Sequence, residues 1–287
     1  MAELDIRTKS CLVTGATGGI GSATARVLGR ERARLVLTDR DQAALDALAD
    51  ALRAEGAEVL LARAADLTDP AAVRRLADEV HATHGSVDVV LNVAGISAWG
   101  TIETLTEDHW RRMLDVNLMG PVHVLSAFVP PMIAAGRGGH VVNVASAAAL
   151  FGLPWHAAYS ASKFGLRGVS EVLRFDLRRH RIGVSLVCPG AVATPLVDSL
   201  EVAGVDRSAP SVRRIEERFL RHAVSPEHAA EAIVGGVRRR RYWVYTSRDV
   251  RLAHLAQRWL PWAYSAAMRL LNRQLVRAVA QATGERR

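Results

Sequence analysis

Short apolar runs alternate with stretches of helical composition through most of the 287-residue chain. Alternation of this kind predicts a parallel sheet with helices on both faces, because each helix returns the chain to the start of the next parallel strand. The expected fold class is therefore α/β, with a doubly wound parallel sheet. The expected strands are 11–14, 35–38, 59–63, 87–92, 140–144 and 183–187, and the main expected helices are 22–30, 42–54, 70–84, 106–128 and 159–180.

The first apolar run leads directly into a glycine-rich turn, Gly15 to Gly21, and a helical stretch follows. Glycines let the backbone approach a pyrophosphate closely, and the helix N-terminus offers free N–H groups to it. The next apolar run ends at Asp39, about 20 positions beyond the glycines, where a carboxylate can accept hydrogen bonds from ribose hydroxyls. Strand, glycine turn, helix and acid together predict a dinucleotide-binding site.

The charges around this site favour NAD. The glycine turn contains no basic residue, and the carboxylate of Asp39 repels the 2′-phosphate that distinguishes NADP. Arg40 follows directly and can either cover the adenine or point into solvent. We expect NAD as the cofactor, with NADP as the alternative.

A second group of residues provides proton-transfer chemistry. Tyr159 and Lys163 are spaced i, i+4 on an expected helix, so they share one face, and Ser146 lies thirteen positions upstream of Tyr159. A nearby ammonium favours the phenolate form of a tyrosine, and a hydroxyl can hold the oxygen of a substrate. Alone, such a pair is common on helix surfaces. Beside a dinucleotide site, it predicts transfer of a proton to or from a carbonyl oxygen.

Several further motifs occur in a fixed order. Asp66-Leu67, Asn92-Val93-Ala94-Gly95, Asn117 within Val-Asn-Leu, and Pro189-Gly190 with Val192 and Thr194 follow the glycine turn. From about Lys9 to Pro195, the sequence resembles the compact branch of the short-chain dehydrogenase/reductase family, although Val93 replaces the family's second Asn. The resemblance implies a Rossmann-like fold. Its cofactor contacts fall on Gly15, Thr17, Gly18, Gly19, Ile20, Asp39, Arg40, Asp66, Leu67, Asn92, Ala94, Gly95, Tyr159, Lys163, Pro189, Gly190, Val192 and Thr194.

The resemblance also implies four catalytic roles. Tyr159 acts as general base in alcohol oxidation and as general acid in carbonyl reduction. Lys163 stabilises the phenolate and binds the nicotinamide ribose, and Ser146 orients the substrate oxygen. Asn117 holds a water that connects Lys163 to bulk solvent. The expected activity is NAD-dependent interconversion of a secondary alcohol and its ketone. NADPH-dependent carbonyl reduction, NAD(H) sensing without turnover, and an interaction protein are the alternatives.

An apolar stretch between Ser146 and Tyr159 favours a lipophilic small-molecule substrate. The segment at about 195–225 is expected to cover it. The expected substrate residues are Ser146, Trp99, Phe151, Trp155, His156 and Leu196. His156 is interpreted as a structural or rim residue rather than a second base. The long helices that contain Asn117 and Tyr159 are expected to pair with a symmetry mate in a homodimer or homotetramer.

Other features narrow the class of protein. The two cysteines, Cys11 and Cys188, both lie in apolar runs, which predicts buried thiols and a reducing, cytoplasmic location. No His, Cys and carboxylate cluster has metal-ligand spacing, so we expect no catalytic metal. The N-terminus has no signal-peptide pattern. The sequence contains no window of 18 or more uninterrupted apolar residues, so we expect no membrane-spanning helix.

The positive charge is concentrated at the C-terminal end. Residues 205–287 contain 17 Arg and 7 acidic residues, whereas residues 1–204 carry a slight negative net charge. We expect a catalytic domain over 1–248, ending in a strand at 242–245, and a basic helical extension over 249–287 with helices at 250–260 and 261–280. This extension packs on its own domain or a partner subunit, or contacts an anionic membrane surface peripherally. The sequence contains no recognisable module that reads nucleic-acid sequence, so we do not expect specific nucleic-acid binding.

Overall fold

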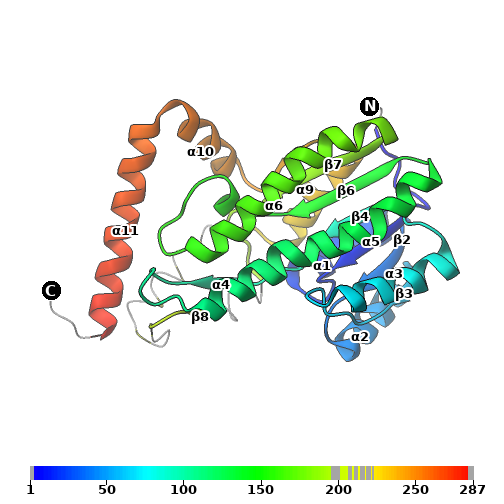
Figure 1. The fold of residues 1–287 in the computed structure, drawn as a ribbon, viewed down its shortest axis with the longest axis horizontal. Coiled ribbons are helices and arrows are strands. Elements are labelled where there is room, and N and C mark those ends of the chain that lie inside the picture. Colours follow the sequence, from blue (N-terminus) through cyan, green and yellow to red (C-terminus); the bar gives the residue numbers. More distant parts are fainter. Residues whose placement is uncertain are drawn as a thin grey trace.

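In the computed structural model, the described residues are 3–194, 201–205, 209, 213, 217, 221 and 223–283. Seven parallel strands form one sheet in the order β3-β2-β1-β4-β6-β7-β9, which confirms the predicted α/β fold with its doubly wound sheet (Figure 1). Its strands are β1 (Ser10–Thr14), β2 (Arg34–Thr38), β3 (Glu58–Ala62), β4 (Val89–Asn92), β6 (Gly139–Val144), β7 (Ile182–Cys188) and β9 (Trp243–Tyr245). A separate short pair joins β5 (Ala98–Trp99) to β8 (Glu201–Val202).

Helices cover both faces of the sheet. They are α1 (Gly19–Arg30), α2 (Gln42–Ala54), α3 (Pro70–His84), α4 (Glu107–Leu114), the π-helical turn η1 (Asp115–Met119), α5 (Gly120–Ala135), the 3₁₀ turns η2 (Ala147–Ala149) and η3 (Arg178–His180), α6 (Ala157–Asp176), α9 (Pro226–Arg238), α10 (Arg248–Trp259) and α11 (Pro261–Thr283). The two helices predicted for the C-terminal extension are therefore present.

Alternate side chains of β1 define the two layers of the core. Cys11 and Val13 pack with residues of α1, α2 and α9 on one face. Leu12 packs with residues of α3 and α5 on the other. Both faces of the strand are buried because a parallel sheet is covered on each side. The thiols of Cys11 and Cys188 are free and fully buried, as predicted, and burial raises the pKa of Cys188 to about 12.

The order of the strands creates a switch point beside β1. From β1 the chain proceeds outward through β2 and β3, and then returns to the other side of β1 to form β4, β6 and β7. Ligands of open α/β sheets bind beyond the carboxyl ends of the strands at such a point. The segments that follow β1, β2, β4, β6 and β7 carry most of the predicted site residues.

The helix predicted at 106–128 is interrupted. Helical structure runs continuously from Glu107 to Ala135, but a π-helical turn separates α4 from α5 and contains Asn117. This stretch is also long and apolar enough to cross a membrane by composition alone. Its α5 part packs on α3 and β4, with Val124 and Phe128 fully buried, so it is a core helix of the domain.

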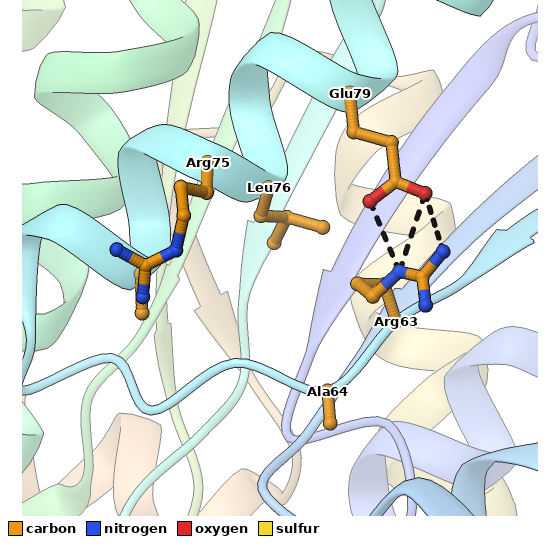
Figure 2. A pocket seen from close by; sticks show the side chains of 6 residues that line it. Arg63, Ala64, Arg75, Leu76 and Glu79 are labelled. Carbon is orange, nitrogen blue, oxygen red and sulfur yellow. Dashed lines mark hydrogen bonds and ion pairs between the residues drawn. The ribbon is translucent and has the colours of Figure 1, made fainter.

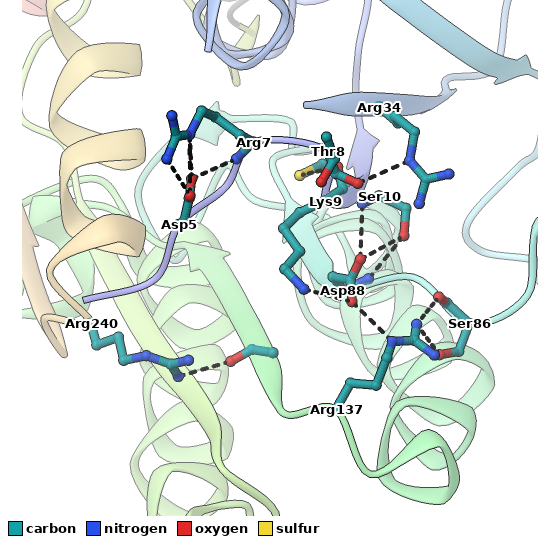
Figure 3. Close-up of polar contacts among 12 residues, drawn as sticks. Asp5, Arg7, Thr8, Lys9, Ser10, Arg34, Ser86, Asp88, Arg137 and Arg240 are labelled. Atoms are coloured by element: carbon teal, nitrogen blue, oxygen red, sulfur yellow. Dashed lines mark hydrogen bonds and ion pairs between the residues drawn. The ribbon is translucent and has the colours of Figure 1, made fainter. Parts of the chain in front are cut away.

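At the opposite edge of the sheet, Asp88 precedes β4 and contacts residues at the start of β1 and before β6 (Figure 3). This residue is only 6 % exposed and accepts hydrogen bonds from the backbone N–H of Ser10, at 3.1 Å, and from the Ser10 hydroxyl, at 3.2 Å. Lys9 and Arg137 form ion pairs with the same carboxylate at 3.7 Å and 3.4 Å. The charge of Asp88 is therefore compensated, and this polar cluster is structural.

A small cleft of about 230 Å³ lies beside α3, on its side toward the end of β3 (Figure 2). Arg63 and Glu79 form a 2.6 Å ion pair on one side of it, and Arg75 lies beyond Leu76 on the other. None of the predicted site residues lines this cleft. The ion pair is exposed and contributes roughly 0–1 kcal/mol to stability.

Candidate active site

The glycine turn after β1 is tightly packed at its base. Gly15 has a φ of +63°, and a Cβ there would lie 2.6 Å from the Cα of Ala94. At Gly21 a Cβ would overlap the carbonyl of Gly15, so both positions require glycine. Gly18 caps the N-terminus of α1 without any side-chain cap. The first N–H groups of α1 therefore stay available for an anion, and the turn fits the pyrophosphate of a dinucleotide.

Asp39 lies beside this turn, as the spacing predicts. One carboxylate oxygen accepts from the backbone N–H of Thr17 at 3.0 Å and from its hydroxyl at 2.6 Å. The other oxygen accepts from the backbone N–H of Arg40 at 2.8 Å. The Arg40 side chain is exposed. Asp39, which follows the end of β2, is therefore held against the glycine turn by its hydrogen bonds to Thr17.

Of the two residues predicted to contact the adenine, Asp66 is exposed and Leu67 is buried. Asp66 is exposed and accepts from the backbone N–H and hydroxyl of Thr68 at 2.9 Å and 2.8 Å. Leu67 is 7 % exposed and packs in the core cluster with α3 and α5. Its carbonyl accepts from the Nδ1 of His123 at 2.8 Å.

The segment after β4 connects the glycine turn to the predicted catalytic residues. The hydroxyl of Thr14 accepts from the backbone N–H groups of Val93 and Ala94, at 3.1 Å and 3.3 Å. A Cβ at Gly95 would lie 3.1 Å from the Oδ1 of Asn117 and 3.3 Å from the Nζ of Lys163. Asn117 and Lys163, both predicted to be catalytic, therefore lie close to each other beside Gly95, which is a predicted cofactor contact.

Asn92, also predicted to contact the cofactor, is buried at the end of β4. Its side-chain amide donates to the Oδ1 of Asn143 at 2.9 Å, and Asn143 donates to the hydroxyl of Ser170 at 2.9 Å. The Oδ1 of Asn92 has no partner although it is buried. This chain of amides fixes the end of β4 relative to β6 and α6.

Asn117 is fully buried within the π-helical turn. Its Oδ1 accepts from the backbone N–H of Ile96, and its amide donates to the Ile96 carbonyl, both at 2.9 Å. The same amide donates to the hydroxyl of Ser162 at 3.2 Å, and this hydroxyl donates to the carbonyl of Tyr159 at 2.7 Å. Isolated π-turns are frequent at functional sites. Here the turn directs the side-chain amide of Asn117 toward Ser162, near the start of α6.

Tyr159 and Lys163 lie one turn apart on α6, as predicted. The ammonium of Lys163 is buried and donates to the carbonyl of Val144 at 3.0 Å, and it lies 5.8 Å from the centroid of the Tyr159 ring. Burial lowers the pKa of Lys163 to about 8. Burial also raises the pKa of Tyr159, against a hydrogen bond with Ser146 that lowers it. The depressed tyrosine pKa expected from the sequence is therefore not found in the chain alone.

Ser146 precedes the 3₁₀ turn η2. Its hydroxyl accepts from the backbone N–H of Ala148 at 3.1 Å and forms the hydrogen bond to Tyr159 that lowers the pKa of the phenol. The fold therefore brings together all four predicted catalytic side chains: Ser146 from the end of β6, Tyr159 and Lys163 from α6, and Asn117 from η1.

The loop after β7 lies next to this group. The carbonyl of Pro189 accepts from the backbone N–H of Ala147 at 2.7 Å, directly beside Ser146. Gly190 packs against Val250 of α10, where a Cβ would lie 2.9 Å from a methyl group. Val192 forms an isolated bridge with Val224, and Thr194 is half-buried.

Trp99 and His156 form one wall beside Tyr159. Their rings lie 4.2 Å apart between centroids, and the His156 and Tyr159 rings meet edge to face at 6.2 Å. The Nδ1 of His156 donates to the carbonyl of Pro154 at 2.7 Å, and burial lowers its pKa to about 4. A neutral imidazole fixed in this way is a poor general base, which agrees with the rim interpretation.

The other predicted substrate residues are placed differently. Phe151 is 9 % exposed and packs with Leu186, Cys188 and Val250 in an apolar cluster. Trp155 is half-buried and has a φ of +68°. Leu196 lies outside the described residues.

Three positions that support the site were not singled out from the sequence: Thr14, Asn143 and Ser162. Each is a polar residue inside an apolar strand or on the buried side of a helix. A buried polar residue needs hydrogen-bond partners, so this pattern is the signal that could have revealed them. In the part of the chain that the structure describes, no group of three or more His, Cys, Asp or Glu side chains could hold a metal ion.

Comparison with known proteins decides the family. A profile of the short chain dehydrogenase family matches residues 9–203. The chain belongs to this family. It is an oxidoreductase of the short-chain dehydrogenase type, and a nicotinamide dinucleotide is the cofactor typical of the family.

Relatives from Mycobacterium and Streptomyces match most of the chain. The protein SadH of Mycobacterium tuberculosis is 37 % identical over 231 residues, which cover 80 % of this chain and 82 % of that protein. The 1-deoxy-11-beta-hydroxypentalenate dehydrogenase of Streptomyces avermitilis is 34 % identical over 248 residues, which cover 86 % of this chain and 87 % of that enzyme. EphD of M. tuberculosis is 35 % identical, but the match spans only 39 % of EphD and 80 % of this chain.

Solved structures share the fold and differ in cofactor. A short-chain dehydrogenase/reductase from Burkholderia phymatum, crystallised with NAD, has a TM-score of 0.79 and 31 % identity, over 88 % of this chain and 95 % of that one. A metagenomic short-chain oxidoreductase, crystallised with NADP, has a TM-score of 0.67 and 33 % identity, over 84 % and 96 % of the two chains. The structural likeness therefore leaves the choice between NAD and NADP to the residues of this chain.

Proposed function

We propose that this protein is an NAD-dependent dehydrogenase that interconverts a lipophilic secondary alcohol and its ketone. The observation that carries the proposal is the convergence of Asn117 and Lys163 on Gly95, together with the interaction between Ser146, which follows β6, and Tyr159, which lies on α6. Proton-transfer groups and a dinucleotide cradle thus share one edge of the sheet. When bound, NAD supplies the acceptor for the hydride that leaves the carbinol carbon.

Within this proposal, Tyr159 takes the hydroxyl proton of the alcohol during oxidation and returns it to the carbonyl oxygen during reduction. Ser146 donates a hydrogen bond to the same oxygen and stabilises the negative charge that develops on it. Lys163 stands one helical turn away, where its charge favours the phenolate. Its pKa of about 8 lets it exchange a proton near neutral pH, and its ammonium is available to bind the nicotinamide ribose.

Asn117 acts as a positioning residue in this scheme. It fixes the Ile96 backbone on one side and Ser162 on the other, and Ser162 in turn contacts the Tyr159 carbonyl. Its Oδ1 also lies close to the position where Lys163 approaches Gly95. The family resemblance implies that Asn117 also holds a water that relays protons between Lys163 and solvent, and this role is part of the proposal.

Asp39 supports NAD over NADP. Its carboxylate is held at the glycine turn by Thr17, and a phosphate on the adenosine ribose would approach this negative charge. The repulsion between two close charges near a protein surface is about 1–4 kcal/mol, which corresponds to a preference of about tenfold or more. We expect Asp39→Ala to raise kcat/KM with NADP relative to NAD.

A panel of aliphatic, aromatic and polycyclic secondary alcohols tests the activity, with NAD and NADP in parallel and the formation of NADH or NADPH followed by absorbance. We expect turnover with lipophilic alcohols and NAD. Binding of NADH without turnover of any alcohol or ketone would favour a sensor. A higher kcat/KM with NADP than with NAD would favour the NADPH-dependent carbonyl reductase.

We also propose that the enzyme is a homodimer or homotetramer. Met119, Phe164, Val172 and Phe175 are large apolar side chains, and each is 39–60 % exposed on η1 and α6. Apolar faces of this kind are typical of subunit contacts. Sedimentation velocity of the wild type and of Phe175→Glu tests this: we expect a lower mass for the variant, and a monomeric wild type would contradict the proposal.

A further inference from the structure

The hairpin formed by α10 and α11 extends to one side of the sheet domain (Figure 1). Several contacts attach it to this domain. Val250 packs in the apolar cluster that includes Phe151, the hydroxyl of Tyr264 donates to the carbonyl of Gly152 at 3.1 Å, and Tyr245 is hydrogen-bonded to His254 at 2.9 Å. The hairpin therefore adjoins the loop between Ser146 and Tyr159.

Large apolar side chains are exposed on α10 and at its junction with α11. Leu252, Leu255 and Trp259 are spaced i, i+3, i+7 on α10, so they form one stripe, and Leu260 and Trp262 follow at the bend. These five residues are called the elbow patch. The two tryptophans are the most exposed, at 74 % and 71 %. A solvent-exposed group of this kind marks an interaction site.

The elbow patch lies in strongly basic surroundings. Residues 248–283 contain six arginines and one acidic residue, Asp249, so the hairpin carries a net charge of +5. Arg251 and Arg258 lie on the exposed part of α10 beside the patch. Arg269, Arg273 and Arg277 recur every fourth residue along α11 and are also exposed. Arginines beside exposed tryptophans and leucines are the pattern of a helix that lies in a membrane interface.

Charge decides between a membrane and a second copy of the chain as the occupant. A two-fold contact through this surface would bring together two hairpins that each carry a net charge of +5, and like charges at an interface cost affinity. A bilayer with anionic headgroups supplies both the opposite charge and an apolar interior, and each arginine near such a surface adds favourable energy.

We propose that the α10–α11 hairpin docks the enzyme peripherally on a membrane surface rich in anionic phospholipids. The elbow patch enters the interfacial region, and the arginines contact lipid phosphates. Because the hairpin adjoins Phe151 and Gly152, docking places the loop between Ser146 and Tyr159 close to the bilayer. Delivery of a lipophilic substrate from the bilayer to this loop rests on the proposed function. The docking itself does not depend on that function.

Co-sedimentation of the full-length protein with vesicles tests the docking. One set contains phosphatidylcholine and phosphatidylglycerol, and the other contains phosphatidylcholine alone. We expect binding to the anionic vesicles only, weakened by salt. Trp259→Ala/Trp262→Ala and Arg251→Ala/Arg258→Ala should each weaken it by about tenfold or more. The matched control Arg53→Ala/Arg74→Ala removes two exposed arginines from α2 and α3, away from the hairpin, and should leave binding unchanged.

Intrinsic fluorescence gives a second measure, because insertion of the two tryptophans shifts emission to shorter wavelength. Activity of each variant in buffer on a water-soluble alcohol should equal that of the wild type, so a failed docking test and a failed activity test remain distinct. Equal sedimentation with both vesicle types, or an equal loss in the control variant, would overturn the proposal. So would a tryptophan variant that binds vesicles normally but has lost its oligomeric mass, because the patch would then join two copies of the chain.

Discussion

The carboxyl edge of the sheet and the α10–α11 hairpin use polar and apolar residues in opposite ways. At the edge of the sheet, Asn117 and Lys163 are buried, and their polar atoms are fixed by backbone carbonyls and amides. On the hairpin, Trp259 and Trp262 are exposed among arginines. The first region therefore holds its polar groups fixed in place for chemistry, whereas the second exposes its side chains to solvent.

The largest effect should come from the edge of the sheet. Ser146→Ala removes the hydroxyl that contacts Tyr159, and we expect kcat to fall by about 100-fold or more, the usual result of losing one donor to a developing oxyanion. Ser160→Ala is a matched control one residue from Tyr159, since its hydroxyl is buried without a hydrogen-bond partner. Steady-state kinetics with NAD measures both. Equal kcat values in the two variants would show that the Ser146 hydroxyl has no special role.

The core beneath this edge should be sensitive to lost volume. Phe128 is fully buried in α5, where its ring meets His81 edge to face at 5.2 Å. Replacement by alanine leaves a cavity, and we expect Phe128→Ala to lower the free energy of unfolding by about 3–5 kcal/mol. Urea denaturation followed by circular dichroism measures this. A loss below about 1 kcal/mol would mean that α5 is loosely packed on the sheet.

Acid should destabilise the sheet domain through His140. This residue is fully buried in β6, where its Nε2 donates to Ser185 at 2.8 Å, and burial lowers its pKa to about 3. Between pH 6.5 and 3 the unfolded chain binds a proton that the folded chain does not. Folding stability therefore decreases as the pH falls, by about 1.4 kcal/mol per unit from this group.

Urea denaturation of the wild type and of His140→Gln, from pH 7 to pH 5, separates this contribution. The slope of stability against pH should be smaller in the variant, whatever its absolute stability. Identical slopes would mean that His140 titrates normally in the folded protein.

The smallest effect is expected on the hairpin. Trp262 is larger than Phe128 but 71 % exposed, so Trp262→Ala should change the free energy of unfolding by no more than about 0.5 kcal/mol. Differential scanning calorimetry in the absence of lipid measures this. A destabilisation as large as that of Phe128→Ala would show that the hairpin is packed as tightly as the core, and the contrast between the two regions would be lost.

The sequence predicts most of the fold because apolar strand-like runs alternate with helical stretches through most of the chain. It does not predict the π-helical turn at Asn117, since local composition around 106–128 favours an ordinary helix and the turn depends on contacts with Ile96. It also misses the pairing of β5 with β8, which joins two-residue strands from distant parts of the chain. Such contacts leave no periodic pattern in either segment.

The candidate site shows the same division. The positions of Gly15, Asp39, Tyr159 and Lys163 follow from motif spacing, and the fold brings them to one edge. The supporting hydrogen bonds of Asn143 and Ser162 depend on which side of a strand or helix is buried, so they emerge only from the packed structure. The raised pKa of Tyr159 likewise reflects burial, which a spacing rule does not contain.

The most direct test of the account is Tyr159→Phe, with NADH binding and alcohol oxidation measured side by side on the same preparation. The variant keeps the ring and removes only the hydroxyl. We predict an unchanged Kd for NADH and a loss of turnover of about 1,000-fold or more. Turnover equal to that of the wild type would contradict it.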